Sequence, residues 1–115
     1  MSTDIQDIPR ETRESARLFN CLGNPARLNV LCLLAIEGEM FVGQMCEKTG
    51  HTPPSLSSQL RILRVNGLVE VRREGVTKFY SLVGGIEGIA SQVQAAVDSI
   101  RKSSPKEPKA KRRTT

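Results

Sequence analysis

The chain has 115 residues, of which 38% are hydrophobic but only 3% aromatic, and its formal net charge is +5. This length allows one domain with tails around an aliphatic core, and a domain so small gains stability by dimerising. No apolar run approaches the roughly 20 residues that cross a bilayer, and the start of the chain is polar and acidic, so we expect a cytoplasmic protein without a membrane segment.

Helical spacing of apolar residues begins after a polar leader. We expect residues 1–9 to be flexible and a first helix to run from 10 to 22. Asn24 is a good N-cap and proline suits the first helical position after it. A second helix is therefore predicted over 25–36, and its continuous apolar run indicates a central, buried helix.

Two shorter helices and a hairpin follow. The sequence predicts a third helix over about 42–48 and a fourth, capped by Thr52, over about 53–65. Two extended segments, 68–73 and 78–82, surround a short glycine turn and predict a β-hairpin.

The remainder of the chain is predicted to be one long helix and a tail. A last helix is expected over about 86–102, and residues 103–115, rich in Pro, Lys and Arg, are expected to be disordered. Two short helices followed by a hairpin give the order of a winged helix-turn-helix domain. We therefore predict a mainly α (α+β) fold with about five helices and a two-stranded wing over residues 10–102.

The fourth helix has an apolar stripe and a polar face. Leu56, Leu60 and Leu63 form the stripe, and Gln59 lies at its flank. Small hydroxyls on the other face would let the helix approach a DNA duplex closely, and arginines would reach bases or phosphates. The alternative is a solvated face that happens to be rich in serine. The candidate contacts on this helix are Pro53, Pro54, Ser55, Ser57, Ser58, Gln59, Arg61 and Arg64.

Cations gather on the predicted hairpin. Residues 48–80 have a net charge of +4, although residues 1–100 together have −1. Arg72, Arg73 and Lys78 lie on adjacent strands, where like charges destabilise an isolated hairpin, whereas a phosphate backbone would neutralise them. Pairing of one or two of them with Glu70 and Glu74 is the alternative.

Three stretches carry a family resemblance: LFNCLGNPARLNVLCLL, FVGQMCEKTGHTPPSLSSQLRILRVNGLVEVRREG and TKFYSL. In them the chain resembles the ArsR/SmtB family of bacterial repressors, and together they cover more than half of its length. The resemblance implies a homodimer that binds an operator in double-stranded DNA, represses transcription and is released by an inducer. It also implies that the recognition-helix positions are Pro53, Pro54, Ser55, Ser57, Ser58 and Gln59.

The resemblance implies neither a metal site nor a cofactor. The residues at the ligand positions of the metal-sensing members are unable to bind metal: Phe41, Gly43, Gly84, Ile86, Val97 and Ile100. A redox subgroup pairs a cysteine of the second helix with one of the last helix. Cys32 matches the first, but the second position is Ser99. Cys21, Cys32 and Cys46 stay candidate thiol sensors, with the alternative that Cys21 and Cys32 only fill the core.

The last helix predicts an interface. Ile86, Val93 and Ile100 recur every seven residues, which is typical of a helix–helix seam, although packing onto its own domain is the alternative. The resemblance places a dimer interface on this helix and the first one. The candidate interface residues are Leu18, Leu22, Ile86, Ile89, Val93, Val97 and Ile100. The basic tail would either track phosphates or serve only solubility.

We interpret the sequence as that of a sequence-specific DNA-binding transcription regulator, a repressor released by an inducer or a thiol signal. The alternative is a winged-helix module that binds protein and has lost contact with DNA. An enzyme is not expected, because the sequence has no grouping of Asp, His, Ser or Cys typical of catalysis and no phosphate-binding glycine loop.

Overall fold

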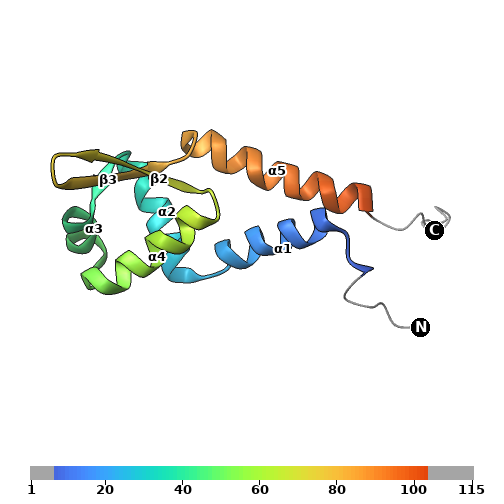
Figure 1. Cartoon of the computed structure of the whole chain (residues 1–115), viewed down its shortest axis with the longest axis horizontal. Helices are drawn as coiled ribbons and strands as arrows, with labels where there is room; N and C mark the ends of the chain where they lie inside the picture. Colours follow the sequence, from blue (N-terminus) through green and yellow to red (C-terminus); the bar gives the residue numbers. More distant parts are fainter. Residues whose placement is uncertain (1–6, 104–115) are drawn as a thin grey trace.

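The computed structural model describes residues 7–103, which form five helices and a three-stranded sheet (Figure 1). In chain order the elements are α1 (Arg10–Leu22), α2 (Pro25–Glu37), β1 (Met40–Phe41), α3 (Val42–Thr49), α4 (Pro53–Val65), β2 (Val69–Glu74), β3 (Thr77–Leu82) and α5 (Gly85–Ser103). Most of the predicted leader and all but the first residue of the predicted basic tail lie outside the described residues.

Side-chain caps fix where two of the helices begin. Asn24 accepts a hydrogen bond from the backbone N–H of Arg27 at 3.0 Å, at the start of α2. Thr52 accepts one from the backbone N–H of Ser55 at 3.3 Å, at the start of α4. Such caps satisfy amides that have no partner inside the helix, so both predicted starts are confirmed.

The sheet contains one strand that the sequence did not predict. Its order is β1-β3-β2, with both pairings antiparallel, so β3 lies at the centre. β1 has two residues, which is too short for any hydrophobic periodicity to mark it. The wing is therefore a hairpin with a short third strand at its base. Its turn is also shorter than predicted, because Glu74 already pairs with Thr77.

The hydrophobic core lies between the helices and the base of the sheet. Its fully buried side chains come from α2, α3, α4 and the residue before β2, and the largest are Val30, Leu34, Met45, Leu56, Leu60, Leu63 and Leu68. The predicted burial of α2 holds for only one side of the helix, which carries the buried Val30, Leu31 and Leu34. Leu28 and Ile36 are exposed, Ile36 by 79%, because α2 covers the core with one face only.

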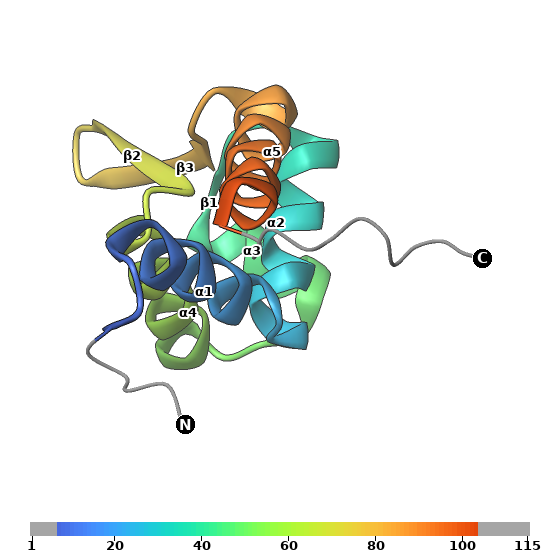
Figure 2. The same ribbon diagram turned by 90° about the vertical axis from the view of Figure 1, so that its right-hand side faces the viewer.

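α1 and α5 run side by side and extend beyond the core toward one end of the molecule (Figures 1 and 2). α5 approaches the end of β3 closely at Gly88, where an added Cβ would collide with the carbonyl oxygen of Val83. In residues 7–103 no single helix is long and apolar enough to cross a membrane; α1 and α2 reach that length only as a pair bent by 82°.

Candidate nucleic-acid interface

The predicted recognition helix, α4, has the two faces that its sequence indicates. Leu56, Leu60 and Leu63 are buried in the core. Of the predicted contact residues on this helix, Gln59 is half-buried and the rest are exposed: Pro53, Pro54, Ser55, Ser57, Ser58, Arg61 and Arg64. α4 therefore presents a polar surface of small side chains near its start and arginines in its second half.

The turn before α4 is tight. Gly50 ends α3 with a φ of 79°, in the left-handed region that glycine adopts without strain, and its N–H donates to the carbonyl of Cys46 at 2.8 Å. His51 follows and is half-buried, with its Nε2 atom buried and without a hydrogen-bond partner among the described residues. α3 and α4 thus form the two helices of a helix-turn-helix unit.

Two of the three wing cations share one face of the hairpin. Arg73 lies directly opposite Lys78 in the β2–β3 register, and both are exposed. Neither forms an ion pair with any residue in the described part of the chain. Two adjacent like charges without a counter-charge favour an anionic ligand at this point.

Arg72 is placed differently, because neighbouring residues of a strand point to opposite faces. Its guanidinium donates to both carboxylate oxygens of Glu39, at 2.9 and 2.8 Å, and Glu74 lies 3.5 Å away. It also lies 4.7 Å from the centre of the Phe79 ring. The hydrogen bonds with Glu39 raise the pKa of Arg72 and lower the pKa of Glu39. The predicted pairing with an acidic residue is present, but its main partner is Glu39, 33 positions earlier in the chain.

The start of α4 and the turn of the wing lie at the same end of the molecule, with α3 between them (Figure 1). Figure 2 shows α4 and the wing on one side and α2 on the other. α4 and the hairpin that carries Arg73 and Lys78 therefore lie on the same side of the molecule.

Gln59 makes a contact that the sequence did not suggest. Its side-chain oxygen accepts a hydrogen bond from Nη1 of Arg27 at 3.2 Å, and Nε of the same arginine donates to the carbonyl oxygen of Cys21 at 2.9 Å. Arg27 thereby connects the end of α1, the start of α2 and the recognition helix. Neither Arg27 nor Glu39 was identified from the sequence, because both contacts join residues more than 30 positions apart.

The three cysteines have different surroundings, and all are free thiols. Cys21 is buried, Cys46 is half-buried and Cys32 is exposed on α2. Burial raises the pKa of the Cys21 thiol, although the nearby Arg27 opposes part of this rise. Within residues 7–103, no three His, Cys, Asp or Glu side chains come together in an arrangement that would hold a metal ion.

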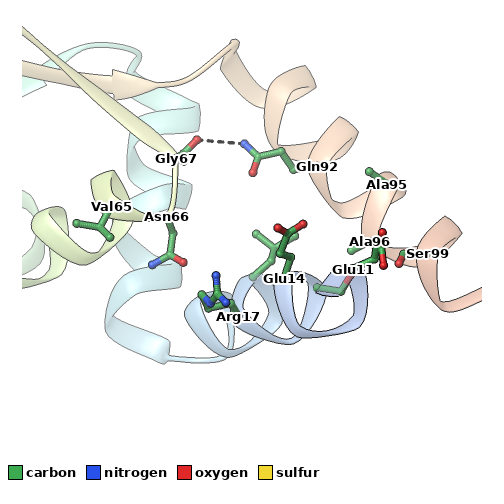
Figure 3. A pocket seen from close by; sticks show the side chains of 12 residues that line it. Glu11, Glu14, Arg17, Val65, Asn66, Gly67, Gln92, Ala95, Ala96 and Ser99 are labelled. Carbon is green, nitrogen blue, oxygen red and sulfur yellow. Dashed lines mark hydrogen bonds between the residues drawn. The ribbon is translucent and has the colours of Figure 1, made fainter. Parts of the chain in front are cut away.

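A groove of about 730 Å³ lies between α1 and α5 and reaches the end of α4 (Figure 3). Gln92 of α5 donates a hydrogen bond to the carbonyl oxygen of Gly67 at 3.2 Å at one end of it. Of the predicted interface residues, Ile86 and Ile100 are each 55% exposed, and the others are half-buried in the single chain: Leu18, Leu22, Ile89, Val93 and Val97.

Residues 24–71 match the family described as bacterial regulatory protein, arsR family. The chain is 38% identical over 95 residues to the biofilm growth-associated repressor of Xylella fastidiosa, covering 83% of this chain and 80% of that protein. It is 32% identical over 79 residues to the transcriptional activator HlyU of Vibrio cholerae, covering 69% and 72%.

Solved structures of bacterial transcription regulators have the same fold as this chain. A homodimeric winged helix-turn-helix DNA-binding domain from Mycobacterium bovis superposes with a TM-score of 0.66 at 31% identity, covering 92% of this chain and 94% of that one. The transcriptional repressor BigR from Xylella fastidiosa gives 0.60 at 32% identity, covering 90% and 100%. The chain therefore belongs to the arsR family of bacterial regulatory proteins and is a winged helix-turn-helix, DNA-binding regulator of transcription.

Proposed function

We propose that two copies of the chain bind an operator together and repress transcription, with α4 in the major groove and the wing on the flanking backbone. The observation that carries this proposal is that α4, which has exposed polar residues, and the hairpin with the exposed Arg73–Lys78 pair lie on the same side of the molecule (Figure 2). Small side chains let a helix approach base edges, and unpaired cations release counterions from phosphates. Because bacterial DNA lies in the cytoplasm, the protein acts there in this proposal.

In this proposal the three wing cations have two different roles. Arg73 and Lys78 contact phosphate, whereas Arg72 holds the base of the wing through Glu39. The exposed residues of α4 supply base or phosphate contacts, with Pro53 and Pro54 stiffening its start.

Dimerisation through α5 and α1 is supported by three observations. Ile86 and Ile100 are large apolar side chains left half-exposed on α5. A groove lies between the two helices. The Mycobacterium bovis relative is described as homodimeric. Dimers of this motif bind two half-sites about one helical turn of DNA apart, and in the proposed dimer a two-fold axis beside α5 would relate the two α4 helices.

The test is fluorescence anisotropy with DNA from upstream of the protein's own coding region, over a range of salt concentrations. We expect the logarithm of affinity to fall linearly with the logarithm of salt. A variant with both Arg73→Ala and Lys78→Ala should bind more weakly and lower the salt slope by about 2. Arg10→Ala, which removes an exposed cation of α1 paired with Glu14, is the matched control and should change little.

Absence of salt-dependent binding to any DNA would overturn the proposal and favour a module that binds protein. Release by an inducer is a further part of the proposal. If the signal is a thiol reagent, Cys32 is the accessible target. A variant in which all three cysteines are serine should then lose the response while keeping its affinity for DNA.

A further inference from the structure

Arg27 is held in one position by contacts on three sides. Its backbone N–H donates to the capping side chain of Asn24. Its Nε donates to the carbonyl oxygen of Cys21 at 2.9 Å, at the end of α1. Its Nη1 donates to the side-chain oxygen of Gln59 at 3.2 Å. Because the first two contacts fix the arginine, the third fixes the side chain of Gln59.

The chemistry of the pair determines how the amide of Gln59 is turned. A guanidinium has only N–H donors and no acceptor, so the atom of Gln59 that faces Arg27 is the oxygen. The NH₂ group lies on the other branch of the planar amide and is directed away from Arg27. Gln59 lies at the flank of α4, half-buried, one turn after Ser55 and three positions before Ile62, both of which are exposed.

We propose that Arg27 is a positioning residue that makes Gln59 a pure hydrogen-bond donor toward DNA. This inference rests on the proposed DNA-binding function and specifies what one recognition residue contacts. The NH₂ group of Gln59 donates to an acceptor, which is a phosphate oxygen or the O6, N7 or O4 atoms of bases in the major groove.

The same geometry excludes the contact that glutamine most often makes with bases. A glutamine that binds adenine donates to N7 and at the same time accepts from the N6 amino group. Here the oxygen already accepts from Arg27 and is turned toward that side chain. Adenine and cytosine amino groups therefore meet a donor, which leaves two donors facing each other and lowers affinity.

The decisive variant is Gln59→Glu. A carboxylate keeps the contact with Arg27 but presents an oxygen where the NH₂ group was, so fold and thermal midpoint should be kept. We expect DNA affinity to fall about ten-fold or more, because an acceptor then faces an acceptor. Gln44→Glu on α3 is the matched control. The side-chain oxygen of Gln44 also accepts a hydrogen bond, from the N–H of Phe41 at 3.1 Å, and the substitution adds the same charge.

A second variant, Arg27→Met, tests positioning directly. Without the guanidinium the amide of Gln59 can turn round, so adenine should become better tolerated. In a scan of single base-pair changes across the operator, the unaltered protein should penalise adenine at one position, and Arg27→Met should reduce that penalty about ten-fold. Arg27→Lys, which retains a single donor nitrogen, should restore part of the discrimination.

The two sources of the acceptor give different outcomes. If the acceptor is a base, the base-pair scan shows the change and neutral methylphosphonate linkages do not. If it is a phosphate oxygen, one methylphosphonate weakens the unaltered protein several-fold but not Gln59→Met. Either result supports the inference. The inference is overturned if Gln59→Glu binds DNA as tightly as Gln44→Glu. It is also overturned if neither the base-pair scan nor the methylphosphonate substitutions distinguish the unaltered protein from its Arg27 and Gln59 variants. If the unaltered protein binds no DNA, the proposed function itself fails, and this inference fails with it.

Discussion

Arg72 of the wing and Glu39, the residue before β1, form an ion pair with two hydrogen bonds, at 2.9 and 2.8 Å. The pair joins the hairpin to the chain that leaves α2. Next to it, the rings of Phe41 and Phe79 meet edge to face with centres 5.9 Å apart. The base of the wing is therefore fixed on the face opposite to Arg73 and Lys78, whose side chains remain available to a ligand.

Glu39→Gln should loosen the base of the wing. A neutral amide gives Arg72 only one acceptor and no charge, so a two-bond contact becomes a weaker one. We expect hydrogen exchange at the amides of β1 and of its partner residues on β3 to become several-fold faster. Glu70→Gln removes an exposed carboxylate from the same hairpin and should leave these rates unchanged. Equal exchange in the two variants would show that the pair does not hold the wing.

Acidification should release the same contact. Hydrogen bonds from Arg72 lower the pKa of Glu39 below its ordinary value of 4.5. The contact with Arg72 therefore stabilises the folded wing only while the carboxyl group of Glu39 is ionised. The stabilisation is fully present above that ordinary value and is lost as pH falls through the lower pKa of the folded state. Carboxyl-detected NMR titration of Glu39 would measure this. In Arg72→Gln the pKa should move up, and an unchanged value would contradict the assignment of its cause.

Leu60→Ala should destabilise the domain strongly. Leu60 is 1% exposed and packs in the centre of the core, so truncation leaves a cavity and should cost about 2–5 kcal/mol. Urea denaturation at fixed protein concentration measures the difference. Val76→Ala, at a wing-turn residue that is 98% exposed, is the control and should change stability by less than about 0.5 kcal/mol.

Ile86→Glu should weaken self-association. In the proposed dimer this half-exposed residue of α5 is covered by the partner, so a carboxylate there would have to lose its hydration. We expect sedimentation velocity to show a dimer dissociation constant at least about ten-fold higher. Val76→Glu adds the same charge at the tip of the wing and should not shift it. An unaltered dissociation constant in Ile86→Glu would mean that α5 does not form the interface.

The cysteines should react in an order set by exposure. Cys32 should be alkylated first by iodoacetamide, Cys46 more slowly and Cys21 last, since Cys21 is buried and burial raises the pKa of its thiol. Mass spectrometry of peptides after timed quenching would give the rates, and the unfolded protein should show no such order. Rapid modification of Cys21 in the folded protein would mean that α1 opens from the core.

The starts of α2 and α4 and the inward face of α4 could be predicted because their determinants are local. Asn24 and Thr52 mark where helices begin, and the stripe of Leu56, Leu60 and Leu63 indicates the inward face of α4. These signals come from neighbouring residues, so they need no tertiary information.

The contacts that tune the site could not be predicted in the same way. Arg72 and Arg73 are adjacent arginines, and nothing in the sequence was a reason to treat them differently. In the structure their side chains point to opposite faces of β2, and Glu39 lies on the face of Arg72. Gln59 was identified as a flank residue, but its orientation depends on Arg27, 32 positions away. Such pairs bring together parts of the chain that become neighbours only after folding.

The link between α4 and β2 has a consequence for the spacing of the contacts that the protein makes with an operator. Leu68 is fully buried, its N–H donates to the carbonyl of Leu63 at 2.9 Å, and its own carbonyl accepts from Val83 at 3.0 Å. These contacts attach the end of α4 directly to the start of the hairpin. In the proposed dimer we therefore expect each copy to hold its α4 and wing contacts at one spacing on the duplex, so that a different separation of half-sites would require the two copies to tilt against each other.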